Sequence, residues 1–404
     1  LIYMYSDMSR ASTGMLGTDP ANAHAMRLAG IDDNTKNPSG GEILRDQDGH
    51  ATGVLRETAE DLVGRVRARA AANPATWQRA IEQANEECLA NGITSFHDAG
   101  TKFAEIDMYR AAAQAGKLEV RLWIMVRDSL PQMQQRLDEY RMVNFADGYL
   151  TVRAIKQSLD GALGSHGAWV REPYEDLVSS TGLNTLPLSE LKQVAKLAAE
   201  KDFQLCVHAI GDQANHEVLN LYEQTFKRYP TKNSRRWRIE HAQHLLPTDI
   251  PRFGKLKVIA AMQGIHCTSD AVFVGMRLGQ RRAATGAYMW RSLLDNGATI
   301  ANGTDAPVED VNPIPSFYAS VTRKTRDGVA FFPAQCMTRE EALRSYTIDA
   351  AYAAFEDTTK GSLSPGKVAD ITVLSRNLMT CPEDEILKTE VEFTVVGGEI
   401  RFRQ

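Results

Sequence analysis

Residues 204–241 read QLCVHAIGDQANHEVLNLYEQTFKRYPTKNSRRWRIEH and contain one strand–helix–strand unit. The apolar run 204–208 predicts a short buried strand, the helical periodicity of 214–226 predicts a helix, and 237–241 predicts the next strand. Both predicted strands end in a histidine, His208 and His241. This alternation is typical of βα units that build a parallel sheet.

The same alternation extends along most of the chain. Neither GxGxxG nor GxxxxGK[ST] occurs, although a doubly wound sheet usually begins with such a phosphate loop. We therefore expect a (β/α)₈ TIM barrel whose first strand is missing from this sequence. The other predicted helices cover 77–90, 103–115, 130–142, 188–201, 287–296 and 316–324, and the other predicted strands cover 93–98, 120–126, 150–156, 258–262 and 299–305.

The two ends of the chain differ from this pattern. Residues 42–46 and 52–56 flank an Asp48-Gly49 turn and predict a β-hairpin. The tail contains short strand-like pieces that predict a small β module. We expect an insert and hairpin region over 1–72, the barrel over 73–357, and the C-terminal part of a β-sandwich over 358–404.

Composition narrows the classes of function. The 404 residues are 43% hydrophobic and 24% charged, as in ordinary soluble domains. The net charge of −5 disfavours nucleic-acid binding, and no apolar run approaches the ~20 residues of a membrane-spanning helix. The five cysteines show no CxxC spacing, which favours reduced thiols. The chain opens on Leu1, so we expect an upstream segment; the cytoplasm is favoured, a periplasmic or secreted location stays open, and so does a homo-oligomer.

Polar residues at the carboxyl ends of barrel strands face the mouth where such enzymes work. A lone histidine there is more often structural, but His208 and His241 follow successive strands, and imidazole is a common metal donor. Asp305 precedes Ala306-Pro307 and by itself reads equally as a turn or N-cap residue. Read with the two histidines, it becomes a candidate metal ligand and general base.

Lys156 ends an apolar strand, where a bare ammonium is costly to bury. It is either an outward lysine that reaches water or a neutral amine that can take up carbon dioxide as a carbamate. The glycine-spaced loop over 160–169 follows directly, and it lacks the Lys-Ser or Lys-Thr end of a phosphate cradle. We expect a substrate loop. Its aromatic residues, taken singly, are more often packing than ligand contacts.

Five ordered segments, 155–165, 207–212, 238–243, 303–307 and 361–370, resemble the amidohydrolase superfamily. The branch is amidohydrolase family 3, which includes N-substituted formamide deformylase. The resemblance implies a metal-dependent hydrolase that acts on the C–N bond of an amide, N-formyl or cyclic amide substrate. It also implies a TIM barrel flanked by a β-sandwich.

The resemblance further implies roles for individual residues. Lys156 would be the carbamylated ligand bridging a binuclear centre, His208 and His241 would hold the second metal, and Asp305 would bind metal and accept the proton from metal-activated water. One or two divalent ions are implied, with zinc favoured. The residues expected to contact the small-molecule substrate are His166, Tyr174, Trp169, His266 and Trp290.

Two departures from the family pattern stand out. No His-x-His pair occurs in the chain, and His166 stands where relatives commonly have arginine. We expect the missing pair to lie on a first strand upstream of Leu1; the other possibility is that this chain cannot bind its first metal. Two alternatives to the hydrolase stay open: a deaminase built on the same ligands, and a degenerate barrel that binds a ligand without turning it over.

Overall fold

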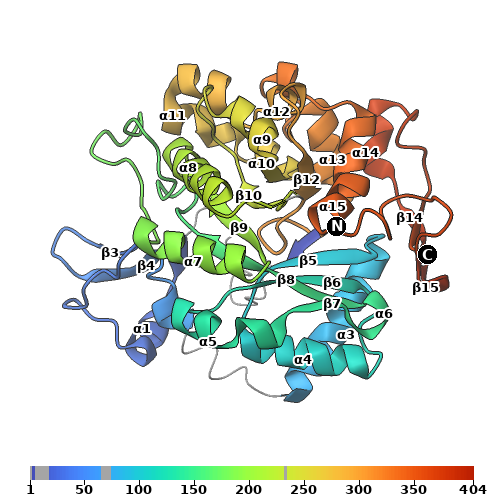
Figure 1. The fold of residues 1–404 in the computed structure, drawn as a ribbon. Helices are drawn as coiled ribbons and strands as arrows, with labels where there is room; N and C mark the ends of the chain where they lie inside the picture. The colour runs from blue at the N-terminus through green and yellow to red at the C-terminus, as the bar shows by residue number, and fades with distance from the viewer. Residues whose placement is uncertain (1, 5–17, 65–73, 232–233) are drawn as a thin grey trace.

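The computed structural model describes residues 2–4, 18–64, 74–231 and 234–404, and its centre is a curled sheet of parallel strands (Figure 1). Eight strands of this described part follow the order β1-β5-β6-β8-β9-β10-β11-β12 with parallel pairing throughout. The outer strands β1 and β12 approach each other, which curls the sheet into a barrel. The bounds are Ile2–Met4 (β1), Ser95–Thr101 (β5), Arg121–Val126 (β6), Leu150–Ser158 (β8), Gln204–Ala209 (β9), Arg238–His241 (β10), Ile259–Gln263 (β11) and Ile300–Gly303 (β12).

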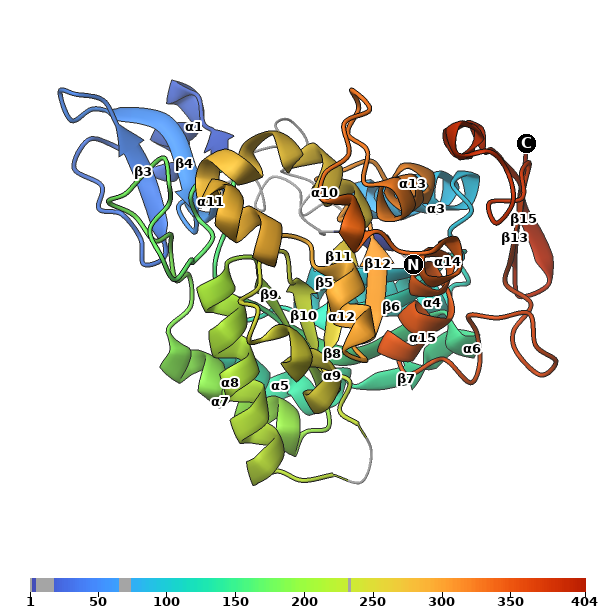
Figure 2. The ribbon, with the colours of Figure 1, turned by 90° about the horizontal axis from the view of Figure 1, so that it is seen from above.

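Helices surround these strands, as the view from above shows (Figure 2). Their buried faces carry the apolar residues that the helical periodicity requires, such as Leu191, Val194 and Ala198 of α7. The helices are Pro74–Ala90 (α3), Phe103–Gln114 (α4), Leu130–Tyr140 (α5), Phe145–Gly148 (α6), Leu188–Glu200 (α7), Asp212–Arg228 (α8), Ile250–Leu256 (α9), Gly264–Ser269 (α10), Ala271–Gly286 (α11), Trp290–Asp295 (α12), Pro313–Thr322 (α13), Arg339–Tyr346 (α14) and Ile348–Ala353 (α15).

Residues of β9 show how each strand serves two layers. Leu205 and Val207 belong to the large core between sheet and helices. Cys206 belongs to a separate cluster of mostly small side chains together with Ala154, and Trp123 supplies bulk there. Because neighbours along a strand face opposite sides, polar side chains at the strand ends are presented to the barrel mouth.

Polar side chains close the opposite end of the barrel. Arg238 and Gln204, the first residues of β10 and β9, both donate to the carbonyl oxygen of Ala353, over 2.6 and 2.9 Å. Arg238 also donates to His97 Nδ1 over 3.1 Å and stacks 4.3 Å above the Trp123 ring. Because buried polar groups require partners, these hydrogen bonds hold the end of α15 against this end of the barrel.

A small module lies beside the barrel, built from α1 (Ala23–Ala29) and the antiparallel strands β2 (Thr18–Pro20), β3 (Gly41–Arg45) and β4 (Ala51–Glu57). It has a core of its own that includes Ile43 and Leu55. Glu57 accepts hydrogen bonds from Ala162 N (3.2 Å) and Ser165 Oγ (3.3 Å), so the end of β4 is joined to the loop that follows β8.

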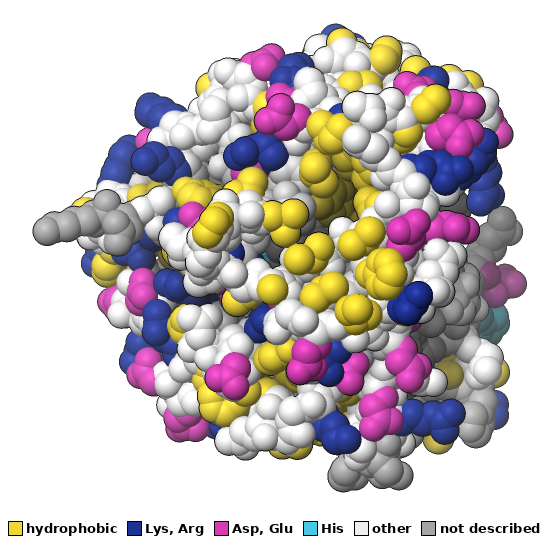
Figure 3. All heavy atoms as spheres, turned by 90° about the vertical axis from the view of Figure 1, so that its right-hand side faces the viewer, with side chains coloured by type: hydrophobic (Ala, Val, Ile, Leu, Met, Phe, Trp, Pro, Cys, Tyr) yellow, Lys and Arg dark blue, Asp and Glu magenta, His cyan; other side chains and the backbone are white. Residues whose placement is uncertain are grey.

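The C-terminal module is an antiparallel sheet of β13 (Ile371–Leu374), β14 (Val391–Val396) and β15 (Glu399–Arg403). Asp370 accepts two hydrogen bonds from the buried guanidinium of Arg121 (2.8 and 3.1 Å), which joins this sheet to β6. Figure 3 views the molecule from this side and shows hydrophobic side chains around a hollow, with acidic and basic side chains interspersed.

The expected α/β barrel and antiparallel C-terminal sheet are confirmed, and the seven strands predicted from sequence all appear. The first barrel strand was expected to be missing from this sequence, whereas the described structure has an eighth parallel strand, β1, paired with β5; its three residues are too few to show a pattern in sequence. The helix predicted over 130–142 ends at Tyr140, because Met142–Asn144 (β7) pairs with β8 instead. The expected boundaries at 72 and 357 stay predictions; of residues 1–72, the structure describes 2–4 and 18–64.

Candidate metal centre at the barrel mouth

The strand ends bring several predicted site residues together. The rings of His208 on β9 and His241 on β10 are 4.4 Å apart, and the rings of His241 and His266 are 6.1 Å apart and nearly parallel. Ligand atoms of His241, His266 and Asp305 all lie within 4.8 Å of one another. Side chains that are distant in sequence therefore converge, and the tightest group contains His266, which sequence analysis assigned to the substrate.

His241 is held in the form that a metal ligand needs. Its backbone has a φ of +74° at the end of β10, which turns the chain into the following loop. Its Nδ1 lies 2.8 Å from Gln263 Oε1, an acceptor, so Nδ1 carries the proton and Nε2 keeps its lone pair. Burial, with smaller contributions from His266 and Lys156, lowers the pKa of His241 well below its usual value, and the imidazole is neutral at pH 7.

His266 is the second buried imidazole of the group. It lies on α10, directly after β11, and Gln243 Nε2 is 3.2 Å from its Nδ1. Within the described residues its Nε2 has no hydrogen-bond partner. Burial lowers the pKa of His266 to about 4, so this ring too is neutral at pH 7.

Asp305 and Lys156 complete the inner mouth. Asp305 follows β12, is buried, and adopts a φ of +59°, a backbone conformation that is uncommon for a non-glycine residue and worth noting at a site. Lys156 is 1% exposed on β8, opposite Cys206 of β9 in the strand register. Its ammonium therefore lies inside the barrel and does not reach solvent as a surface lysine does.

Two of the residues predicted to contact the substrate, Trp169 and His166, are partly exposed. Trp169 is half-buried and its carbonyl oxygen accepts from Gln213 N and Ala214 N at the start of α8. His166 pairs with Asp176 over 3.0 Å within the same loop.

Tyr174 and Trp290 are fully buried. Tyr174 Oη donates to Ala168 O over 2.6 Å, and Trp290 packs under the Arg323 guanidinium. These contacts hold the loops; substrate contact by Tyr174 or Trp290 stays a prediction.

Sequence analysis missed the residues that orient the histidines. Gln263 is the last residue of β11 and Gln243 follows β10, and their side chains bond to the rings of His241 and His266. Asp160 lies next to His208. Only their position could have pointed to them. Gln243 and Asp160 lie within four residues of the predicted site residues His241 and Lys156, and Gln263 ends the next strand, β11. Glutamine and aspartate in loops are too common for composition to single them out.

A buried acid–phenol pair lies in the same region of the chain. Tyr288 Oη donates to Asp270 Oδ2 over 2.5 Å, and burial raises the pKa of Asp270 to about 7. The Tyr288 ring meets His244 edge to face, and burial lowers the pKa of His244 to about 3. At pH 7 the His244 imidazole is thus neutral, and the Asp270 carboxyl is about half protonated.

Comparison with known proteins matches the described architecture. A family model described as "Amidohydrolase family" matches residues 18–402. Protein LONG AFTER FAR-RED 3 of Arabidopsis thaliana is 34% identical over 94% of this chain, which spans only 66% of that relative's length. Putative amidohydrolase YtcJ of Bacillus subtilis (strain 168) is 30% identical, and the match covers 95% of this chain and 72% of the length of that relative. N-substituted formamide deformylase of Arthrobacter pascens is 30% identical, covering 95% and 71%.

Solved structures share the fold. An uncharacterized metal-dependent hydrolase from Pyrococcus horikoshii OT3 superposes with a TM-score of 0.76 at 24% identity, over 91% of this chain and 71% of that one. Atrazine chlorohydrolase TrzN from Arthrobacter aurescens TC1, complexed with zinc, superposes with a TM-score of 0.56 at 17% identity, over 82% and 73%. Among the described residues, no helix has both the length and the apolar character to cross a bilayer.

Proposed function

Since this chain belongs to the amidohydrolase family, we propose that it is a metal-dependent hydrolase that cleaves a carbon–nitrogen bond in a small molecule. The observation that carries the proposal is the convergence of His241, His266 and Asp305, whose ligand atoms lie within 4.8 Å of one another. The name of one relative, N-substituted formamide deformylase, supports an N-formyl or related amide as the substrate class.

The donor set fits a divalent cation. Two neutral imidazoles and a carboxylate are ligands that zinc prefers, and His241 has a lone pair at Nε2 because Gln263 engages Nδ1. His208, whose ring is 4.4 Å from that of His241, is the next ligand candidate. A bound divalent cation would polarise the scissile carbonyl and make a water molecule more acidic. A carbamate on Lys156 would add the negative ligand that a second cation needs.

Asp305 is the proton carrier in this proposal. Its carboxylate would accept a proton from the attacking water and deliver it to the leaving nitrogen, which departs as an amine. Its burial among the imidazoles keeps bulk water from competing for that proton. If His241 and His266 give their lone pairs to a cation, Asp305 is the group of the three that is left to act as the base.

The test of this role is Asp305→Asn. The amide cannot accept the proton, so we expect turnover to fall at least ~10³-fold on a panel of N-formyl amines and amides, measured by formate, carboxylate and ammonia release. Asp310→Asn, five residues away and exposed, is the matched control and should retain activity. Turnover of Asp305→Asn near that of the wild type would contradict the proposal.

The metal content tests whether the protein binds a divalent cation. The purified protein should hold at least one equivalent of zinc or a similar ion by elemental mass spectrometry, and a strong chelator should abolish turnover reversibly. His241→Ala should lower the metal content, whereas His216→Ala, whose ring pairs with Asp249 on the outer helices, should not. A wild-type protein with less than about half an equivalent would favour a binding role instead.

A further inference from the structure

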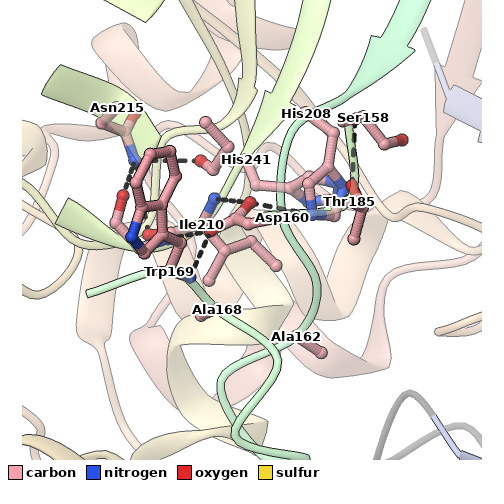
Figure 4. Close-up of polar contacts among 12 residues, drawn as sticks. Ser158, Asp160, Ala162, Ala168, Trp169, Thr185, His208, Ile210, Asn215 and His241 are labelled. Atoms are coloured by element: carbon pink, nitrogen blue, oxygen red, sulfur yellow. Dashed lines mark hydrogen bonds and ion pairs between the residues drawn. The ribbon is translucent and has the colours of Figure 1, made fainter. Parts of the chain in front are cut away.

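The loop that follows β8 contains a carboxylate that is completely enclosed. Asp160 accepts hydrogen bonds from the backbone N–H groups of Ile210 (3.0 Å, to Oδ1) and Trp169 (2.9 Å, to Oδ2), both labelled in Figure 4. It also accepts one from Gly211 N (2.8 Å, to Oδ2). Ile210 and Gly211 lie between β9 and α8, and Trp169 lies further along the loop itself. Three backbone donors therefore fix the plane of this carboxylate.

The same carboxylate faces a histidine of the candidate centre. Asp160 Oδ1 lies 3.5 Å from His208 Nε2, and Oδ1 carries only one of the three backbone hydrogen bonds. Ser158, two residues before Asp160, is paired with His208 in the β8–β9 register. The pairing of β8 with β9 thus places Asp160 beside the His208 ring. The contact does not depend on two mobile side chains meeting by chance.

An imidazole has one nitrogen on each of two edges. A carboxylate beside Nε2 favours a proton there, which leaves the lone pair on Nδ1. Metal-binding histidines commonly present one nitrogen to the metal and donate the other N–H to a carboxylate or a carbonyl, which fixes the ring and raises its basicity. Gln263 does this for His241 at Nδ1, and Asp160 is placed to do it for His208 at Nε2.

We propose that Asp160 is a positioning residue that orients His208 to bind a divalent cation through Nδ1. The inference rests on the proposed function, because it assumes that His208 is a ligand. Asp160 acts through His208 and touches neither substrate nor cation. The same carboxylate also fixes Trp169 N, whose carbonyl oxygen in turn accepts from Gln213 N and Ala214 N, so the metal ligand and the substrate loop share one anchor.

The experiment is a double-mutant cycle on zinc affinity, measured by competition with a chromophoric chelator. We expect Asp160→Asn to weaken zinc binding about 10- to 100-fold, the range for lost outer-shell partners. In a His208→Ala background the same substitution should change zinc affinity less than about threefold, because its target is gone. Cobalt(II) loaded into Asp160→Asn should show a shifted visible absorption spectrum relative to the wild type.

The matched control is Asp212→Asn. Asp212 is a neighbouring half-buried carboxylate that accepts a backbone hydrogen bond, from Arg171 N over 2.8 Å, without an ion pair to His208 in the described contacts. Its substitution should leave zinc affinity and the cobalt spectrum unchanged. If Asp160→Asn does not fold, Asp160→Ser, with room for a water to meet the backbone donors, takes its place in the cycle.

The outcomes separate the two proposals. Equal losses of zinc affinity from Asp160→Asn with and without His208 would overturn the positioning role, and so would affinity within threefold of the wild type in a folded variant. Unchanged affinity in His208→Ala alone would also overturn it, while leaving a metal site at His241. A wild-type protein that binds no zinc would instead overturn the proposed function.

Discussion

Gly211, directly before α8, lies close against the backbone of the loop that follows β8. A Cβ built on Gly211 would lie 2.1 Å from Trp169 O and 2.7 Å from Trp169 N, where real Cβ atoms are essentially never closer than 3.0 Å. The φ of Gly211 is −71°, which alanine adopts freely, so the cost of Gly211→Ala is steric. The two backbones would have to separate by about 1 Å.

The magnitude follows from the contacts that this separation breaks. Overpacking of this kind costs about 1–3 kcal/mol, and losing the hydrogen bond from Gly211 N to Asp160 adds about 1.5 kcal/mol. We therefore expect Gly211→Ala to lower the free energy of unfolding by about 3 kcal/mol. Zinc affinity should fall as well, since Asp160 would lose one of its three anchors.

Urea unfolding followed by tryptophan fluorescence measures the first effect, with an unchanged slope indicating an unchanged unfolding transition. Gly64→Ala is the control, because a Cβ there meets nothing within 4 Å. It should be neutral or stabilise slightly. A Gly211→Ala protein within 0.5 kcal/mol of the wild type, on the scale of ordinary surface changes, would refute the packing argument.

Two further predictions concern stability. Burial raises the pKa of Asp98 to about 7, so the folded state holds a proton there that the unfolded state releases from about pH 4 upward. The contribution of Asp98 to stability should therefore fall between pH 4 and 7, by at most about 4 kcal/mol, and the urea midpoint of Asp98→Asn relative to the wild type should be higher at pH 8 than at pH 5. Asp370→Ala leaves the buried guanidinium of Arg121 without its partner and should lower the free energy of unfolding by about 3–5 kcal/mol. The control Glu399→Ala removes an exposed pair with Arg401 and should change that free energy by no more than about 0.5 kcal/mol. Equal effects would contradict the view that Asp370 joins the C-terminal sheet to the barrel.

Much of the barrel could be predicted from sequence because strands buried on both sides are continuous apolar runs between amphipathic helices. The run 204–208, for example, became β9 over Gln204–Ala209. β1 and β7 escaped because three residues carry no period, and strand pairing alone defines them. The hairpin over 42–46 and 52–56 was correctly predicted from its Asp48-Gly49 turn.

The site was less predictable than the fold. Strand-end position identified His208, His241 and Asp305, and the barrel brings His241 and Asp305 together. The place of His266 beside them could not be inferred, since it sits on a helix after β11 whose path depends on tertiary packing. The orientation of the His241 and His266 rings depends on their hydrogen bonds with Gln263 and Gln243, and Asp160 lies beside His208; such contacts leave no periodic trace in the sequence.

The order in which the strands occur along the chain has a consequence for biosynthesis. Lys156 and Asp305 are about 150 residues apart in sequence, and they reach the same mouth only through β8 and β12. At typical translation speeds of ~5–20 residues per second, Asp305 leaves the ribosome roughly 7–30 s after Lys156. During that interval the imidazoles of His208, His241 and His266 are made in turn, and the carboxylate of Asp305 comes last, so the full set of donors becomes available to an ion only late in synthesis.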